Sequence, residues 1–264
     1  MKLPYFEIAA FSARPFAGNP AGVCVLQEWL PDALLQAIGT ENNLAETAFI
    51  VARDGFYELR WFTPTVEVDL CGHATLASAH VIFEHLSPSA ASVRFHSPRS
   101  GELGVAREGD RLVLDFPSRP PVPCETTTQL VDALGRAPAG LYEARDYMAV
   151  FAEESDVANL TPDFAKLAQL PNQGVIVTAP GSDCDFVSRF FAPRLGIDED
   201  PVTGSTHCYL IPYWSERLGK STLFARQLSR RGGEVFCEDA GERVRIGGHA
   251  VTYLTGEIEV PDTI

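Results

Sequence analysis

The chain has 264 residues, 45% of them hydrophobic, which is enough for packed cores in one large or two ordinary domains. Its net charge of −14, with no basic run to offset it, argues against nucleic acid as a partner. The six cysteines form no close pairs, and the sequence has neither a signal-peptide pattern nor eighteen uninterrupted apolar residues. We therefore expect reduced thiols, no membrane partner and a cytoplasmic location.

In chain order, the first part is predicted to be rich in strands. A strand at 2–11 and another at 21–26 are joined by Gly18-Asn19-Pro20, a strong turn signal. A helical pattern opens at Pro31-Asp32 and runs to about Gly39. The remaining predicted strands of this part are 47–53, 57–62, 92–97, 102–107 and 111–116.

One stretch organises the chain, FTPTVEVDLCGHATLASAHVIFEHL at 62–86. An aromatic strand ends in Pro, an acidic connection follows, and Gly72 opens an apolar helix predicted at 73–86. The same plan recurs at 191–218, where Gly204 opens a helix predicted at 205–218. The first backbone N–H groups of a helix have no partner inside it and lie at the positive end of its dipole, so both starts are candidate anion sites.

The two stretches belong to a longer internal repeat. Pro31-Asp32 aligns with Pro162-Asp163, Arg60 with Arg189 and Gly72 with Gly204, at offsets of 131, 129 and 132 residues. Four prolines at 117–123 mark a stiff linker between the copies. We predict an N-terminal half at 1–117, completed by a last strand within 251–264, and a pseudo-symmetric C-terminal half at 118–250.

The predicted fold class is α+β, a duplicated two-domain arrangement in which strands wrap one helix in each half. The halves are expected to face each other across a cleft. Residues at the two helix starts are then candidates for a carboxylate site, with His73 from one copy and Asp200 and Ser205 from the other.

Glu46, in NNLAETAF, is the candidate general acid/base. It leads into an apolar strand, and a carboxylate desolvated by Leu44, Ala48 and Phe49 would have a raised pKa and exchange protons near neutral pH. The alternative interpretation is an ordinary surface acid.

Common cofactor and metal motifs are missing from the sequence. It contains no GxGxxG after a strand, no GxxxxGK[ST], no GxSxG, no HExxH and no paired-cysteine set. We therefore expect acid/base chemistry without a cofactor or a metal.

Four motifs together, PFAGNPAGV, NLAETAF, FTPTVEVDLCGHATLA and GIDEDPVTGSTHC, resemble the phenazine-biosynthesis PhzF-like isomerase family. The resemblance covers nearly the whole chain and implies a diaminopimelate epimerase-like fold, each domain a β-sheet barrel around a central helix, and a homodimer. It also implies proton transfer between carbons of a small carboxylate-bearing substrate, which in PhzF is a cyclic dihydro-hydroxyanthranilate, without metal or organic cofactor. The implied catalytic residues are Glu46, His73 and Asp200, and the implied substrate-binding residues are Asn19, Gly72, His73, Gly204 and Ser205.

One position departs from the related racemases. Cys71 stands where diaminopimelate epimerases and proline racemases have their first catalytic cysteine, but Val202 and Thr203 occupy the matching turn and the second cysteine is missing. We interpret Cys71 as a packed thiol. Two alternatives stay open: an epimerase or racemase that uses Glu46 with Cys71 or Asp200, and a catalytically silent small-molecule binding protein.

Overall fold

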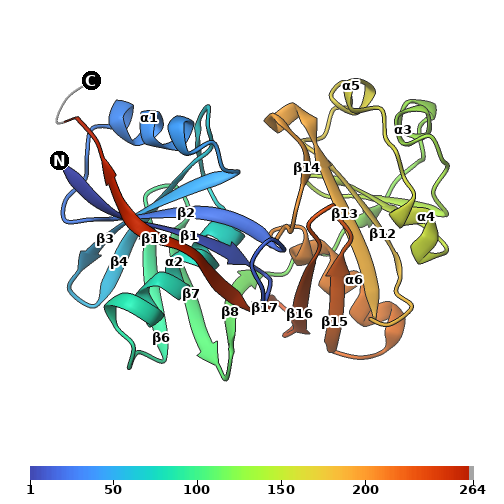
Figure 1. Cartoon of the computed structure of the whole chain (residues 1–264). Helices are drawn as coiled ribbons and strands as arrows, with labels where there is room; N and C mark the ends of the chain where they lie inside the picture. Colours follow the sequence, from blue (N-terminus) through green and yellow to red (C-terminus); the bar gives the residue numbers. More distant parts are fainter. Residues whose placement is uncertain (262–264) are drawn as a thin grey trace. The chain divides into compact units, whose positions relative to one another are not determined.

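The computed structural model describes residues 1–261 and divides the chain into two compact units. Unit 1 comprises Met1–Asp115 and the C-terminal stretch from Gly247, and unit 2 comprises Phe116–Ile246. The strand predicted within 251–264 is β18 (Ala250–Glu259); residues 262–264 lie outside the described part of the chain. Along its whole length β18 pairs antiparallel with β1 (Lys2–Ala10), beside which it lies in Figure 1.

Unit 1 is built of strands around one helix. Its other strands are β2 (Asn19–Leu26), β3 (Glu46–Arg53), β4 (Phe56–Phe62), β5 (Glu67–Val68), β6 (Ser92–Ser97), β7 (Gly101–Glu108) and β8 (Arg111–Pro117), which runs past the unit boundary. Its helices are α1 (Asp32–Asn42), α2 (Gly72–Val81) and the π-helical turn η1 (Ile82–Leu86) that continues α2. The strands pair in the order β18-β1-β2-β3-β4-β6-β7-β8, and β1, β2, β3, β7 and β18 all contact α2.

Helix α2 can lie inside the strands because it has no polar face. Its sequence GHATLASAHV consists mostly of small and apolar residues and carries no acid, lysine or arginine, and nine of its ten residues are buried. Its hydroxyls bond back to the helix itself, Thr75 to the carbonyl of Cys71 at 2.6 Å and Ser78 to that of Ala74 at 2.7 Å. Burying the helix therefore leaves neither hydroxyl without a partner.

Unit 2 repeats this strand plan. Its strands are β9 (Val122–Pro123), β10 (Gly140–Glu143), β11 (Tyr147–Val150), β12 (Val175–Pro180), β13 (Phe186–Ala192), β14 (Ile197–Asp200), β15 (Thr222–Gln227), β16 (Gly233–Asp239) and β17 (Arg243–Gly248). Its helices are α3 (Thr128–Leu134), α4 (Glu154–Ala158), α5 (Phe164–Leu167), η2 (Pro193–Leu195) and α6 (His207–Leu218). The pairs β11–β12 parallel, β12–β13 antiparallel, β13–β15 parallel and β15–β16 antiparallel match β2–β3, β3–β4, β4–β6 and β6–β7 of unit 1.

Helix α6 takes the place in unit 2 that α2 takes in unit 1. It contacts β15 and β16, and its Trp214 stacks on Phe186 of β13 and donates to the Thr178 hydroxyl of β12 at 3.0 Å. The α+β class predicted from the sequence is thus confirmed.

The start of α6 differs from the prediction. The helix begins at His207 rather than Ser205, and residues 204–206 form a turn. The N–H of His207 bonds to the carbonyl of Gly204 at 3.1 Å and that of Cys208 to Ser205 at 3.2 Å, which are the i to i+3 contacts of a tightened first turn.

The interior of α6 carries a proline. Pro212 has no N–H to donate to the carbonyl of Cys208, four residues earlier. That carbonyl instead accepts the N–H of Arg119, at 2.9 Å, from the proline-rich segment at the beginning of unit 2.

Candidate functional site

Glu46 is the first residue of β3 and sits next to Ala21 of β2 in the parallel register. The chain reaches it from α1 through Asn43, whose left-handed conformation (φ 49°) ends that helix. Behind Glu46 the strand enters the core, where Ala48 to Val51 are fully buried. The Glu46 side chain is 13% exposed, so its carboxylate lies at the edge of an apolar layer rather than on an open surface.

His73 lies one residue inside the beginning of α2 and points at Glu46. Its Nε2 lies 3.2 Å from Oε2 of Glu46. Its other ring nitrogen, Nδ1, lies 3.1 Å from the side-chain nitrogen of Asn19 and 3.4 Å from the sulfur of Cys71. One cluster therefore contains four residues from three separate sequence motifs: Asn19, Glu46, Cys71 and His73.

Asn19 is placed in this cluster by a turn that requires glycine. Gly18 has a φ of +65°, and a Cβ there would lie 2.2 Å from the carbonyl oxygen of Ala10. Asn19 follows at the start of β2 and is fully buried. The GNP turn signal therefore marks a residue whose position is fixed by the backbone.

Burial decides the charge of His73. Desolvation lowers its pKa to about 3, so the imidazole is neutral near neutral pH. A neutral ring has one N–H, and with the amide nitrogen of Asn19 donating to Nδ1 that hydrogen is on Nε2. The N–H of His73 is therefore the one beside Oε2 of Glu46, a close polar contact of 3.2 Å that lacks the geometry of a hydrogen bond.

The same cluster contains three potential metal ligands. The ligand atoms of Glu46, Cys71 and His73 lie within 4.8 Å of one another, and no other such group is found among residues 1–261. The two close contacts of His73, however, use nitrogens on opposite sides of its ring. A single ion cannot occupy both contacts, so a metal bound here would use only one of the two ring nitrogens.

In unit 2, Asp200 ends β14 and is 9% exposed. The hydroxyl of Thr203 donates to its Oδ2 at 2.5 Å. Gln227, the last residue of β15, bonds to both the backbone and the hydroxyl of Thr203. Gly204 and Ser205 follow in the turn before α6, so Ser205 is not inside the helix as predicted.

Gln227 belongs to none of the predicted site motifs, although one signal in the sequence marks it. Along β15 the residues alternate between partly exposed and buried, and the buried face consists of Leu223, Ala225 and Gln227. A glutamine on an otherwise apolar face needs buried hydrogen-bond partners, and this need points to a polar network.

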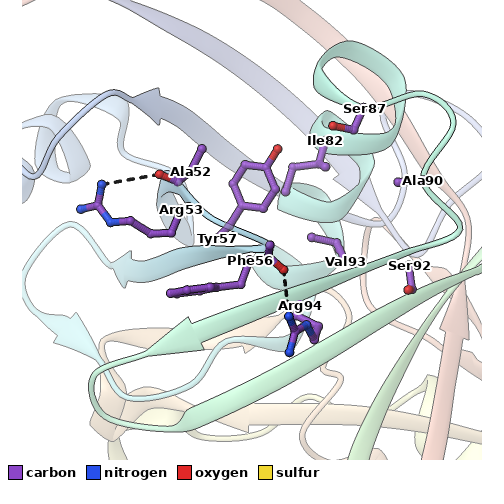
Figure 2. A pocket seen from close by; sticks show the side chains of 11 residues that line it. Ala52, Arg53, Phe56, Tyr57, Ile82, Ser87, Ala90, Ser92, Val93 and Arg94 are labelled. Atoms are coloured by element: carbon purple, nitrogen blue, oxygen red, sulfur yellow. Dashed lines mark hydrogen bonds between the residues drawn. The ribbon is translucent and has the colours of Figure 1, made fainter.

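A separate pocket of about 470 Å³ lies on unit 1 between β3, β4, η1 and β6 (Figure 2). Its two arginines have partners: Arg53 donates to Glu58 at 3.0 Å, and Arg94 donates to the carbonyl of Gly55 at 3.2 Å. None of its lining residues is an acid, a histidine or a cysteine. This pocket therefore lacks the groups for acid/base chemistry that the Glu46 cluster has.

No helix among residues 1–261 is both long and apolar enough to cross a membrane.

Comparisons with known proteins connect these sites to a family. The family model described as phenazine biosynthesis-like protein matches residues 8–256. A Pseudomonas aeruginosa protein named as an uncharacterized isomerase is 53% identical over 260 residues, covering 98% of this chain and 100% of that protein. The crystal structure of a phenazine biosynthesis protein of the PhzF family from Enterococcus faecalis superposes with a TM-score of 0.96 at 48% identity, covering 98% of this chain and 100% of that one.

A more distant structure shows how far the fold extends. A hydroxyproline epimerase from Agrobacterium vitis, solved with bound trans-4-hydroxy-L-proline, has a TM-score of 0.59 at 10% identity, covering 97% of this chain and 91% of that chain. At this identity the likeness concerns the fold alone, which is the diaminopimelate epimerase-like fold predicted from the sequence motifs.

Proposed function

The chain belongs to the phenazine biosynthesis-like family of isomerases, and we propose that it moves a proton between carbon atoms of a small carboxylate-bearing metabolite with Glu46 as the general acid/base. The observation that carries this proposal is the 3.2 Å contact between the Glu46 carboxylate and Nε2 of His73. A carboxylate at the edge of the core, beside a neutral imidazole, can take a proton from carbon and return it.

In the proposed reaction, Glu46 removes a proton from a C–H group, and the electron pair of that bond delocalises into the substrate. The same carboxyl group then delivers the proton to a second carbon, so the reaction is an isomerisation with no net change in protons or electrons. The negative charge that develops must be held where it forms. No cofactor or metal is required by this scheme.

The substrate carboxylate is proposed to bind at the beginning of α2. The first N–H groups of a helix of ten residues attract an anion, and Gly72 and His73 provide them. Gly204 and Ser205 are the proposed substrate-binding residues of unit 2, and Asp200 is its proposed catalytic residue. Asn19 acts through His73.

One observation favours a second candidate function. The sulfur of Cys71 lies beside the same imidazole as Glu46, at 3.4 Å from Nδ1. A thiol and a carboxylate in one cluster could serve as the two bases of an epimerase or racemase, in which one removes the proton and the other returns a different one to the opposite face.

The test is to incubate the protein in heavy water with two probes, a cyclic dihydro-hydroxyanthranilate and trans-4-hydroxy-L-proline, and to follow deuterium by mass spectrometry and proton NMR. One-base isomerisation predicts deuterium at the new C–H position of the product, limited by exchange of Glu46 with solvent. A two-base epimerase predicts complete labelling of the inverted product while recovered starting material stays unlabelled at early times.

The control is Glu46→Gln, which keeps the size of the side chain and removes the titrating group. Its turnover is expected to fall by about a hundredfold or more, the scale of a lost general base. Label that enters at the wild-type rate in this variant would refute the role of Glu46. Binding of a probe without any exchange, in the wild-type protein, would favour a silent binding protein.

A further inference from the structure

The residues around Asp200 form a closed polar network inside unit 2. Gln227 is 1% exposed and Thr203 is 7% exposed. Oε1 of Gln227 lies 2.8 Å from the backbone nitrogen of Thr203, and its Nε2 lies 2.8 Å from the carbonyl oxygen of Asp200 and 3.2 Å from the hydroxyl of Thr203. That hydroxyl lies 2.5 Å from Oδ2 of Asp200.

The direction of every hydrogen bond in this network follows from its chemistry. A backbone N–H only donates, so the Gln227 atom that meets it is the oxygen. A backbone carbonyl only accepts, so the Gln227 atom that meets the carbonyl of Asp200 is the nitrogen. The backbone therefore fixes the orientation of the amide, although its two ends have nearly the same shape.

The orientation of the Gln227 amide in turn determines where the hydroxyl proton of Thr203 points. The second hydrogen on Nε2 of Gln227 points to Oγ1 of Thr203, which accepts it. Thr203 then gives its own proton to Oδ2 of Asp200. A donor of this kind stabilises the ionised form of a carboxyl group and disfavours the protonated form.

We propose that Gln227 is a positioning residue, which turns the hydroxyl of Thr203 toward Asp200 and so keeps Asp200 an ionised hydrogen-bond acceptor. This role rests on the proposed function, in which Asp200 takes part. The two carboxyl groups then have different roles. Glu46 carries the proton, and Asp200 is not the acid that returns it. This network disfavours a racemase that needs Asp200 as its protonated partner.

The charged groups next to the network within unit 2 have other partners. His207 of α6 bonds to the carbonyl of Thr203 through Nδ1, at 2.8 Å, and burial lowers its pKa to about 4, so it is neutral. Arg189 of β13 is paired with Glu199, which precedes Asp200 on β14. Arg226, which precedes Gln227 on β15, is paired with Asp183. The hydroxyl of Thr203 is therefore a donor to Asp200 whose effect can be isolated by substitution.

The experiment compares Thr203→Ser with Thr203→Val. Serine keeps the hydroxyl and valine keeps the shape without it, so the pair isolates one hydrogen bond. The readout is the titration of the Asp200 carboxyl carbon by NMR in the free protein. We expect the valine variant to raise the midpoint by about one pH unit or more, and the serine variant to stay within a few tenths of the wild type. Equal midpoints in the two variants would overturn the proposal.

Gln227→Leu provides a second, independent variant. It removes the amide but leaves Thr203 in place, so the hydroxyl is free to turn and the midpoint is expected to move upward as well. An unchanged midpoint in a folded Gln227→Leu protein would show that Gln227 fills space only. Thermal unfolding of each variant establishes that it is folded.

The titration needs no substrate, so it separates this inference from the proposed function. If Glu46→Gln retains full deuterium exchange, the proposed function fails while the titration still decides the role of Gln227. Where a probe is turned over, Thr203→Val is expected to lower kcat at least about tenfold and Thr203→Ser to remain close to the wild type.

Discussion

Asn19 and His73 lie 54 residues apart in the sequence and 3.1 Å apart in the structure, with the amide nitrogen of one against Nδ1 of the other. This contact determines which ring nitrogen of the neutral His73 carries the hydrogen. Because Nδ1 accepts, Nε2 is the donor, and Nε2 is the atom next to Glu46. Asn19, which is fully buried, thus determines that a ring N–H and not a ring lone pair faces the carboxylate of Glu46.

Asn19→Asp should reverse the hydrogen-bond direction of the imidazole. A carboxylate beside Nδ1 requires a hydrogen on that nitrogen, so His73 either changes tautomer or becomes charged. We expect turnover of a reactive probe to fall by about tenfold or more and the ¹⁵N resonances of His73 to change. Asn159→Asp, on the surface of unit 2, is the control for added charge. An unchanged His73 spectrum in a folded Asn19→Asp protein would contradict the tautomer assignment.

Cys71→Ser distinguishes the isomerase from the epimerase. If Cys71 is a packed thiol, the variant should turn over a reactive probe at a rate within a few-fold of the wild type, and added chelator should change neither rate. Cys24→Ser is the matched control, because Cys24 is also buried and is one of the core residues packed around Phe49 and Phe62. A folded Cys71→Ser protein with no activity, together with an active Cys24→Ser protein, would favour the epimerase over the isomerase as the function of the protein.

Acid should destabilise the protein through its buried histidines. Burial lowers the pKa of His73 to about 3 and that of His207 to about 4, from an unfolded value of 6.5. Between these values the unfolded chain binds protons that the folded protein does not, so the free energy of unfolding falls as pH decreases below about 6.5. Each histidine contributes up to about 1.4 kcal/mol per pH unit.

Urea unfolding between pH 7 and pH 4 measures this slope. His207→Asn is the informative variant, because its side-chain nitrogen can replace Nδ1 as donor to the carbonyl of Thr203 without titrating. The variant should be less sensitive to acid than the wild type. Identical slopes would show that His207 does not contribute to the pH dependence.

Equivalent arginines of the two units offer a test of how alike the units are. Arg60 holds Glu67 with two hydrogen bonds of 2.7 and 2.9 Å and lies over Phe62; Arg189 holds Glu199 with two of 2.7 and 3.0 Å and lies over Phe191. Removing one member of a largely buried ion pair leaves the other member as a buried charge without its partner. We expect Arg60→Met and Arg189→Met each to cost about 2–3 kcal/mol of unfolding free energy.

The loss at Arg189 should be the larger one, because Arg189 also donates to the carbonyls of Val157 and Leu160. Arg136→Met provides the comparison: Arg136 pairs with Asp156 while its own side chain is half exposed, and its loss should cost less than about 1 kcal/mol. Urea unfolding measures all three. An Arg189→Met protein as stable as Arg136→Met would show that the pair adds nothing to unit 2.

Much of unit 1 follows from the sequence because its signals are local. The predicted strands at 92–97 and 57–62 fall within one residue of β6 and β4, and both candidate residues Glu46 and His73 were named from their motifs. The repeat found in the sequence also aligns Arg60 with Arg189, and these two arginines make equivalent contacts in the two units. The matching strand pairs in the two units are what an internal duplication would leave.

The signals were weaker in unit 2. Helices α4 and α5 have five and four residues, too few to show a helical period. The predicted start of α6 at Ser205 is wrong because Gly204 resembles the residue before a helix, whereas contacts of the i to i+3 kind hold the next residues in a turn. Gln227 belongs to no motif, and its importance comes from residues 24 and 27 positions away along the chain.

The proline in α6 has a consequence for how the chain enters unit 2. Because Pro212 leaves the carbonyl of Cys208 without its usual helical donor, that oxygen is available as an anchor for Arg119. The proline inside α6 thereby makes possible the hydrogen bond that attaches the segment around Arg119, which follows unit 1 in the chain. Pro212→Ala would restore a regular helix and place two N–H groups at one oxygen, so a substitution that improves the helix would compete with the attachment of the connecting segment.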